Sequence, residues 1–382
     1  MAATKNSAAP AVLSPRALNR ATLERQLLLR RTAMPAKDAV HHLVGLQAQN
    51  TRPPYYQLCA RLEGFRPAEL AALMESREVA RIVTLRSTIH LHTADDVLSL
   101  RPLVQPARDR ELRVFRAGLT GVDLGRLRSL ATGLVEERPR TPKEIREALH
   151  AEWPGADPRA LGTAARCLLP LVQVTPRGVW GRSGQVALTT AERWLGAPAR
   201  PAPAPDAAVL RYLAAFGPAS VKDMQAWAGL TRLREVFERL RPGLVTFRDE
   251  NGVELFDLPD APRPPEDTPA PPRFLPEFDN VLLGHADRGR VIPPRFHGRN
   301  GKGNQAYGSV LVDGFLAAIW CHDGGGAPGA RPSVLTVQPL AALGPAERDA
   351  VTEEARRMLS VMAPPGTADT CDIRFAAFVD FG

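Results

Sequence analysis

Cysteine is scarce in this chain of 382 residues, and its four cysteines lie too far apart to form a Cys-x-x-Cys pair. Zinc fingers and zinc ribbons use such pairs, and small secreted domains need a denser set of cysteines for their disulfides. We therefore predict no metal site, no disulfide framework and no bound cofactor.

The chain also lacks a long apolar segment. No run approaches the roughly 18 residues that span a bilayer, and the N-terminus has one lysine but no apolar core of a secretory signal. We interpret residues 1–14 as a disordered leader. The sequence predicts a cytoplasmic, bacterial monomer without a membrane partner.

Lysine is rare as well, so arginine supplies most of the positive charge. The chain has 49 basic and 41 acidic residues, a formal net charge of +8. Residues 1–120 hold 18 of the basic and 10 of the acidic residues, so the whole excess is N-terminal. A locally basic face attracts polyanions by releasing their counterions, which favours nucleic acid as a partner, although solvated helices are often mildly basic too.

Two proline-rich stretches, 198–205 and 259–272, divide the chain. Neither has the apolar periodicity of a packed element, and such composition favours extended connections. Together with the repeated pattern described next, they predict four folded units at 15–118, 119–197, 206–258 and 273–382.

A recurring order of elements occupies the first three units. In the second, Thr141 and Glu144 have the spacing of a capping box, and in the third the segment GPASVKDMQAWAGLTRLREVFERL predicts two helices joined by a turn, before a hairpin. In the first, apolar residues at helical spacing precede an alternating segment at 79–93, which predicts paired strands. Helix, turn, helix and β-hairpin is the order of a winged helix, which binds double-stranded DNA or serves as a protein-interaction scaffold.

The last unit has a different pattern. Short apolar segments around turns predict one helix at 345–362 and strands at 281–283, 310–312, 315–320, 334–337 and 373–378. We therefore predict a mainly α fold with β wings (α+β), in which three tandem winged helices precede a C-terminal β-rich domain.

The segment HHLVGLQAQN at 41–50 carries the most informative polar residues. On a helix, Gln47 would share the buried face of the preceding apolar residues. If the helix ends near Gly45 and the chain then runs extended to Pro53, Gln47 and Gln49 point the same way and both amides face one cavity. A glutamine beside an apolar face is more often a satisfied core or capping group, so spacing alone leaves a catalytic role open.

Five segments in this order resemble the AlkZ/AlkX family of winged-helix DNA glycosylases. They are LNRATLERQLL, VGLQAQNTRPPYYQLCARL, RIVTLRSTIHLHTADD, LPEFDNVLLGHADR and VLVDGFLAAIW. The resemblance covers residues 15–380 and implies three winged helices that form a C-shaped channel for double-stranded DNA, closed by a C-terminal β-domain. It also implies a catalytic glutamine–aliphatic–glutamine motif, here Gln47-Ala48-Gln49. One departure is Ser87, where the family usually has glycine after arginine.

Two neutral amides suffice only for certain glycosylase reactions. Glutamine is neither a general base nor a nucleophile at neutral pH, but amides can position water and orient their dipoles toward an oxocarbenium ion. Guanine alkylated at N7 carries a positive charge and leaves as a neutral base. The resemblance and this chemistry together predict hydrolysis of N7-alkylpurines, including bulky adducts and interstrand crosslinks. Lys37 is the only lysine near the motif, which favours a monofunctional enzyme without strand cleavage.

Basic residues outside the motif are candidates for DNA contacts. Arg86, His90 and His92 alternate along the segment 79–93, where they could line the cavity, reach phosphates or form an ordinary polar strand face. The His-x-His pair alone lacks a third metal ligand. The basic loop 295–304 could be a hairpin on the DNA backbone or a surface loop. The predicted DNA-binding residues are Arg52, Arg86, His90, His92, Arg295, Arg299 and Lys302.

Two other functions stay open from the sequence. A non-catalytic DNA-binding protein, such as a regulator or a lesion sensor, would share the fold and the basic N-terminal region. A winged-helix scaffold for protein contacts would show no DNA affinity even at low salt. Base release from alkylated DNA separates a glycosylase from both.

Overall fold

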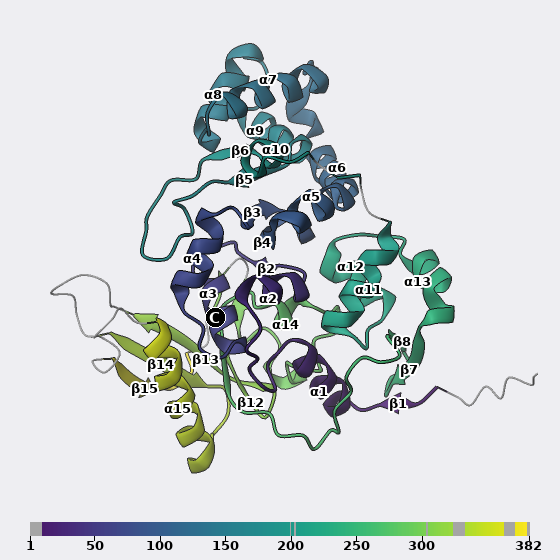
Figure 1. Cartoon of the computed structure of the whole chain (residues 1–382), viewed down its shortest axis with the longest axis vertical. Helices are drawn as coiled ribbons and strands as arrows, with labels where there is room; N and C mark the ends of the chain where they lie inside the picture. The colour runs from purple at the N-terminus through teal and green to yellow at the C-terminus, as the bar shows by residue number, and fades with distance from the viewer. Residues whose placement is uncertain are drawn as a thin grey trace, which may run out of the picture.

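The structure is a computed structural model that describes residues 10–198, 200–201, 204–302, 305–323, 333–362 and 371–379. Helices dominate the first two thirds of the chain, and the largest share of strands lies in the last third (Figure 1). The protein is therefore a mixed α/β protein in which helix exceeds strand.

Residues 15–118 form helices around one β-hairpin. The helices are α1 (Pro15–Arg25), α2 (Ala36–His42), α3 (Pro53–Arg61), α4 (Pro67–Glu75), α5 (Ala94–Leu103), α6 (Gln105–Val114) and the 3₁₀ segment η2 (Arg116–Leu119). The strands are β2 (Leu46–Gln47), β3 (Val79–Val83) and β4 (Ile89–Thr93). The helices α1, α3, α4 and α6 have proline in the first turn, where its missing N–H costs nothing.

The predicted strand pair at 79–93 is confirmed, but its connection differs from the prediction. A 3₁₀ segment, η1 (Leu85–Ser87), joins β3 to β4, and Arg86 and Ser87 in it have φ of 52° and 59°. Arg86 therefore does not lie on the strand face with His90 and His92. The conformation of Ser87 is one that glycine adopts without strain.

The second predicted unit shares a sheet with the first. Its elements are α7 (Leu124–Glu137), α8 (Pro142–Glu152), α9 (Pro158–Leu168), β5 (Leu171–Gln173), β6 (Leu188–Thr190) and α10 (Ala191–Leu195). The capping box is confirmed, since Thr141 Oγ1 accepts from Glu144 N at 3.2 Å and Glu144 Oε2 accepts from Thr141 N at 2.7 Å. Strand β5 pairs with β3, which gives a five-stranded sheet in the order β2-β4-β3-β5-β6.

The third predicted unit has the expected order of helices and hairpin. Its elements are α11 (Pro205–Phe216), α12 (Val221–Ala228), α13 (Arg234–Leu240), η3 (Arg241–Gly243), β7 (Val245–Asp249) and β8 (Glu254–Asp257). The leader was predicted to be disordered through residue 14, but Val12–Leu13 forms strand β1, which pairs in parallel with β7. Residues 1–9 of that leader lie outside the described residues.

The proline-rich stretch 259–272 is held against α1. Arg20 Nε donates to the carbonyl of Thr268 at 2.7 Å, and Arg25 Nη2 donates to that of Pro262 at 3.1 Å. These bonds fix a connection without regular secondary structure, because its carbonyls are satisfied by buried arginines rather than by a sheet.

The last unit is built on a five-stranded sheet in the order β15-β14-β13-β12-β9. Its elements are β9 (Arg273–Leu275), α14 (Asn280–Leu283), η4 (Pro294–Phe296), β10 (Gly301–Lys302), β11 (Gln305–Ala306), β12 (Gly308–Val312), β13 (Phe315–Asp323), β14 (Val334–Pro339), α15 (Pro345–Met362) and β15 (Asp372–Phe375). The predicted helix and four of the predicted strands are confirmed, with β15 ending earlier than expected.

The strand predicted at 281–283 is wrong, because these residues form the short helix α14. Asp279 caps that helix by accepting from Val281 N at 3.1 Å. The same carboxylate forms a two-bond ion pair with Arg61, at 2.7 and 2.8 Å, in which neither side chain is exposed. This pair joins α3 to α14.

One apolar core also joins α2, α3 and α4 to the C-terminal sheet. Within it, the ring of Trp320 contacts Tyr56 and Phe274, with centroids 5.5 and 5.7 Å apart. The helix α15 contacts both α3 and β9, and it covers the sheet at the lower left of Figure 1. The first unit and the β-rich unit are therefore packed as one body.

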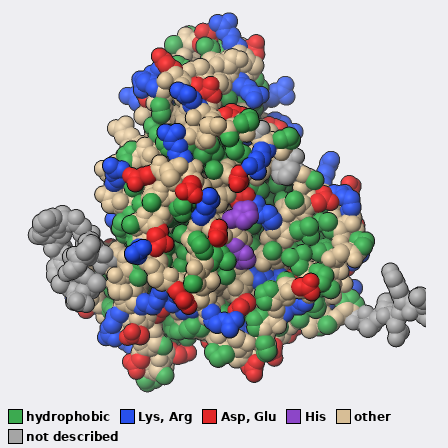
Figure 2. Space-filling model, in the orientation of Figure 1, with side chains coloured by type: hydrophobic (Ala, Val, Ile, Leu, Met, Phe, Trp, Pro, Cys, Tyr) green, Lys and Arg blue, Asp and Glu red, His purple; other side chains and the backbone are tan. Residues whose placement is uncertain are grey.

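The surface shown in Figure 2 carries basic and acidic side chains interspersed over the whole face. The N-terminal excess of basic residues therefore does not form one separate basic face in this view. In the part of the chain that the structure describes, none of the helices has the length and apolarity needed to cross a membrane.

Candidate active site

The glutamine motif lies on an edge strand beside the β3–β4 hairpin. Helix α2 ends at His42, and the chain turns through Val44 (φ 56°) and Gly45 (φ 93°) into β2. There Gln47 faces His90 across an antiparallel pair with β4. The helix therefore ends a few residues before the predicted point near Gly45. The predicted extended run to Pro53 is wrong, because only Leu46–Gln47 is a strand and the chain then bends, with Arg52 at helical φ and ψ of −83° and −37°.

Gly45 is required by the close approach of His92. A Cβ at Gly45 would lie 2.2 Å from His92 Nδ1 and 3.0 Å from the carbonyl oxygen of Leu91. The carbonyl of Gly45 accepts from Asn280 Nδ2 at 2.7 Å, so α14 of the last unit holds the turn from its other side. The turn into the motif therefore depends on a residue without a Cβ at position 45 and on the hydrogen bond from Asn280.

Gln47 is buried and tightly held. The residue is only 5% exposed, and its side-chain Oε1 accepts a hydrogen bond from Arg86 Nη2 at 2.6 Å. Its main-chain carbonyl accepts from Gln57 Nε2 at 3.0 Å. Side chain and backbone of this residue are therefore restrained independently.

Gln49 is exposed and more loosely held. Its Oε1 accepts from the main-chain N–H of Ile89 at 3.3 Å, near the long limit for such a bond. Ile89 begins β4 and Arg86 precedes it in η1, so both glutamine oxygens contact the same end of the hairpin. Gln47 is buried and Gln49 is exposed, so the expectation that both amides face one cavity stays a prediction.

A buried arginine holds the residue between the two glutamines. Arg81 Nη2 donates to the carbonyl of Ala48 at 2.7 Å. Burial lowers the pKa of this guanidinium to about 10, and the neighbouring charge of Arg177 contributes. Arg81 thus remains a cation at neutral pH and restrains the centre of the motif.

His90 and His92 are buried neutral rings on β4. Burial lowers the pKa of His90 well below its usual value and lowers that of His92 to about 4. His90 Nδ1 lies 3.1 Å from the carbonyl of Thr88, which can only accept, so Nδ1 carries the proton and Nε2 faces Arg86 Nη2 at 3.4 Å as an acceptor. His92 is 0% exposed and its Nε2 lies 2.8 Å from Thr84 Oγ1. His92 therefore has a structural position here and does not reach the surface to contact DNA.

A family model described as DNA glycosylase AlkZ-like matches residues 40–361, most of the chain, including the motif and its hairpin. This chain belongs to the AlkZ-like DNA glycosylase family. The protein is therefore an enzyme, a DNA glycosylase, and its family binds DNA as substrate. The function predicted from the sequence is confirmed at this level.

A solved structure supports the same fold. The DNA glycosylase AlkZ of Streptomyces sahachiroi matches with a TM-score of 0.75 at 20% identity, over 96% of this chain and 100% of that one. Among the curated proteins, none matches this chain. The likeness covers both the helical region and the C-terminal sheet of this AlkZ-like protein.

The remaining predicted DNA-binding residues lie outside the hairpin. Arg52 is exposed and precedes α3, directly after the motif. Arg295 and Arg299 are exposed, with their guanidinium carbons 4.7 Å and 5.2 Å from the ring centroids of Phe296 and Phe378. The main chain of Lys302 pairs in the small hairpin β10–β11, while its side chain lies outside the described part.

Three residues that hold the motif were missed by the sequence reasoning: Gln57, Arg81 and Asn280. Each donates to a main-chain carbonyl between Gly45 and Ala48. The only available signal was an arginine between Ala80 and Ile82 in an otherwise apolar strand. Such a position requires a buried acceptor, which the sequence does not identify.

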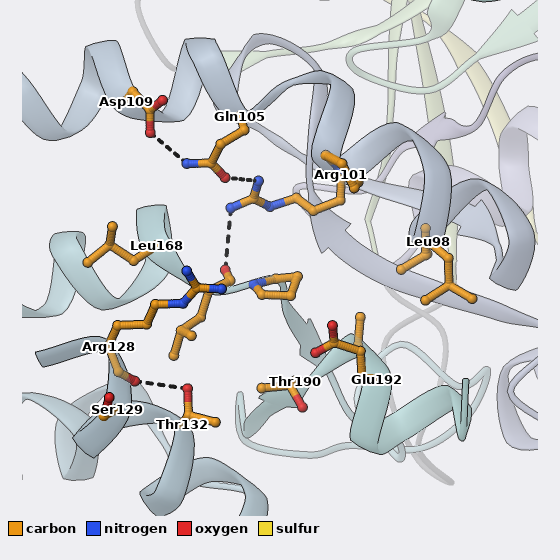
Figure 3. A pocket seen from close by; sticks show the side chains of 15 residues that line it. Leu98, Arg101, Gln105, Asp109, Arg128, Ser129, Thr132, Leu168, Thr190 and Glu192 are labelled. Carbon is orange, nitrogen blue, oxygen red and sulfur yellow. Dashed lines mark hydrogen bonds between the residues drawn. The ribbon is translucent and has the colours of Figure 1, made fainter. Parts of the chain in front are cut away.

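One cavity lies away from the motif. It has a volume of about 950 Å³ between α5–α6, α7 and the β6–α10 junction, where Arg101 and Gln105 bond to one another (Figure 3). Neither Gln47 nor Gln49 lines it. A smaller cavity, of about 380 Å³, lies on the hairpin itself and is lined by Ile82, Val83 and Ile89 together with α8 and α9.

Groups of three or more metal-ligating side chains do not occur among the described residues. The groups bonded to the two glutamine side chains are the guanidinium of Arg86 and the main-chain N–H of Ile89. A carboxylate lies next to the motif, since Glu277 Oε1 accepts from Asn50 Nδ2 at 2.9 Å, one residue after Gln49.

Proposed function

We propose that this AlkZ-like glycosylase hydrolyses the N-glycosidic bond of N7-alkylated purines in double-stranded DNA, with Gln47 and Gln49 as catalytic residues. The supporting observation is that both amide oxygens are anchored at one end of the β3–β4 hairpin, one by Arg86 at 2.6 Å and one by Ile89 N at 3.3 Å. Together the amides position water and stabilise an oxocarbenium-like transition state.

The residue types favour a substrate that is already activated. Neither amide can take a proton from water or attack the sugar at neutral pH. An N7-alkylpurine carries a positive charge, so it leaves as a neutral base without protonation. The chemistry therefore selects cationic adducts and disfavours unmodified bases.

The protein is proposed to be monofunctional. Lys37, the lysine nearest the motif in the sequence, donates from Nζ to Glu78 Oε2 at 2.8 Å on the surface. A lysine nucleophile for strand cleavage would have to be desolvated or beside another cation, so that its amine is uncharged. The ion pair with Glu78 instead keeps the amine charged, because the hydrogen bond to Glu78 raises the pKa of Lys37.

Bulky adducts and interstrand crosslinks are included in the proposal. A large modified nucleotide is hard to extrude into a snug pocket. Gln49 is exposed, so it can approach a lesion that stays within or near the duplex. The exposed cations Arg52, Arg295 and Arg299 are proposed to contact phosphates around it.

The test is base release from duplexes that each carry one defined base. The purified protein is incubated with N7-methylguanine, a bulky N7-alkylguanine adduct or unmodified guanine, and abasic sites are detected by alkaline cleavage. We expect release from both adducts, none from unmodified guanine and no strand break before alkali. Binding without release would favour the non-catalytic DNA-binding protein, and no binding at low salt would favour the scaffold.

A further inference from the structure

Arg86 connects three elements at the motif. From the turn η1, its Nη2 donates to Gln47 Oε1 at 2.6 Å and lies 3.4 Å from His90 Nε2. Its Nη1 donates to the carbonyl of Trp227, in the last turn of α12, at 2.6 Å. The side chain predicted to contact DNA is thus directed at a catalytic glutamine.

The partners of the two glutamines fix how their amides point. Arginine can only donate, so the Gln47 atom that faces Arg86 is the oxygen, and its NH₂ group is directed elsewhere. The main-chain N–H of Ile89 also only donates, so the Gln49 atom that faces it is the oxygen too. Among the described residues, the NH₂ group of either glutamine has no hydrogen-bond partner.

We propose that Arg86 is a positioning residue that holds Gln47 as a hydrogen-bond donor to the attacking water. The Gln47 NH₂ group donates to the water oxygen, while the free lone pair of Gln49 Oε1 accepts one of the water protons. The other lone pair of the water oxygen forms the bond to the sugar carbon, and the base leaves as a neutral molecule with the electron pair of the broken bond. The proton that the attacking water loses passes to solvent water, because neither amide is a base. This inference rests on the proposed function, since it assigns separate tasks to its two glutamines.

The surroundings of Arg86 favour a fixed side chain over a phosphate contact. Its acceptors are an amide oxygen, a ring nitrogen and a carbonyl at the C-terminus of α12, where the helix carries partial negative charge. Burial lowers the pKa of its guanidinium to about 10, and the charge of Arg288 contributes, so it stays cationic at neutral pH. Among the described residues it has no carboxylate partner, and its donors Nη1 and Nη2 are already engaged.

A second arginine at the same helix end supplies a matched control. Arg110 Nη2 donates to the carbonyl of Gly229 at 2.5 Å, directly after α12, and it does not bond to Gln47. Arg110→Met therefore removes a comparable contact to α12 without changing the orientation of the glutamine.

The experiment is a double-mutant cycle on single-turnover base release from N7-methylguanine DNA, at saturating protein. We expect Arg86→Met to lower the rate constant about ten- to a hundredfold, because the Gln47 amide is then misplaced for the chemical step. The affinity for DNA should change less than about threefold, since Arg86 is not proposed to contact DNA. When Arg86→Met is added to Gln47→Ala, the rate constant should fall by less than about threefold relative to Gln47→Ala alone. Arg86→Lys, which keeps one donor, should recover part of the rate, and Arg110→Met should keep it.

Equal losses from Arg86→Met with and without Gln47, or a loss confined to DNA affinity, would overturn the role of Arg86. Thermal unfolding of each variant separates a rate loss from a folding loss. If Arg86→Met does not fold, Arg86→Lys in both backgrounds gives the same comparison. An inactive wild-type protein would overturn the proposed function itself, whereas an active wild type with a fully active Arg86→Met would overturn only this inference.

Discussion

Arg81 donates a hydrogen bond to the main-chain carbonyl of Ala48, 2.7 Å away, from a site that is only 2% exposed. Among the described residues, its Nε and Nη1 have no hydrogen-bond partner. A buried cation with an incomplete set of acceptors costs folding free energy. Its position is therefore explained better by the motif it restrains than by stability.

Arg81→Met tests that interpretation. We expect base release to fall about tenfold or more, because the backbone between the glutamines loses its donor. The midpoint of thermal unfolding should stay unchanged or rise, since an apolar side chain of similar size replaces a buried charge. The exposed Arg77, which donates to the carbonyl of Trp194, gives the control Arg77→Met, and its rate should be unchanged. A lower midpoint of thermal unfolding together with a wild-type rate of base release would show that Arg81 serves only the fold.

Gly45→Ala should disrupt the turn into the motif. A Cβ there meets His92 at 2.2 Å, and the backbone φ of 93° is one that side chains rarely adopt. We expect a loss of about 2–3 kcal/mol or more in the free energy of unfolding, from denaturant titration. Gly64 also has a positive φ, of 59°, but nothing lies within 4 Å of its Cβ position, so Gly64→Ala should cost about 1 kcal/mol. Equal costs at the two sites would contradict the close approach of His92.

Local sequence signals predicted the helix starts and the hairpin well. The capping box of Thr141 and Glu144 acts within a few residues, so its geometry does not depend on the rest of the fold. The strand predicted at 281–283 failed because Asp279, whose position is set by Arg61 in a distant helix, caps a helix there. A run of three apolar residues cannot distinguish these outcomes.

The candidate site was only partly predictable for the same reason. Their spacing predicted that Gln47 and Gln49 lie on one side of an extended chain, but the chain bends at Gln49, and one residue is buried while the other is exposed. The roles of Arg86 and Asn280 depend on contacts across 39 and 235 residues, respectively. Their acceptors are a side-chain amide and a main-chain carbonyl that no local pattern identifies.

Buried neutral histidines make stability depend on pH. Burial lowers the pKa of His92 to about 4 and that of His285 to about 3, whereas an unfolded histidine titrates near 6.5. The unfolded chain therefore binds more protons below pH 6.5, and acid favours it. We expect the free energy of unfolding to be at its full value above pH 6.5 and to fall toward pH 4, by up to about 1.4 kcal/mol per pH unit for each such histidine.

Urea unfolding between pH 7 and pH 5 checks this dependence. His92→Gln should flatten the slope by up to about 1.4 kcal/mol per pH unit, whatever its effect at pH 7. His297 is exposed, and His297→Gln should leave the slope as in the wild type. An unchanged slope in His92→Gln would show that this ring is not kept neutral by burial.

The most direct test of the proposed mechanism is single-turnover release of N7-methylguanine by Gln47→Ala and Gln49→Ala. Gln105→Ala, which removes a glutamine bonded to Arg101 and Asp109 in the separate cavity of Figure 3, is the control. We predict that each motif variant loses about a hundredfold or more in rate while still binding DNA, and that Gln105→Ala keeps the wild-type rate. Wild-type rates in either motif variant would contradict the assignment of Gln47 and Gln49 as the catalytic residues.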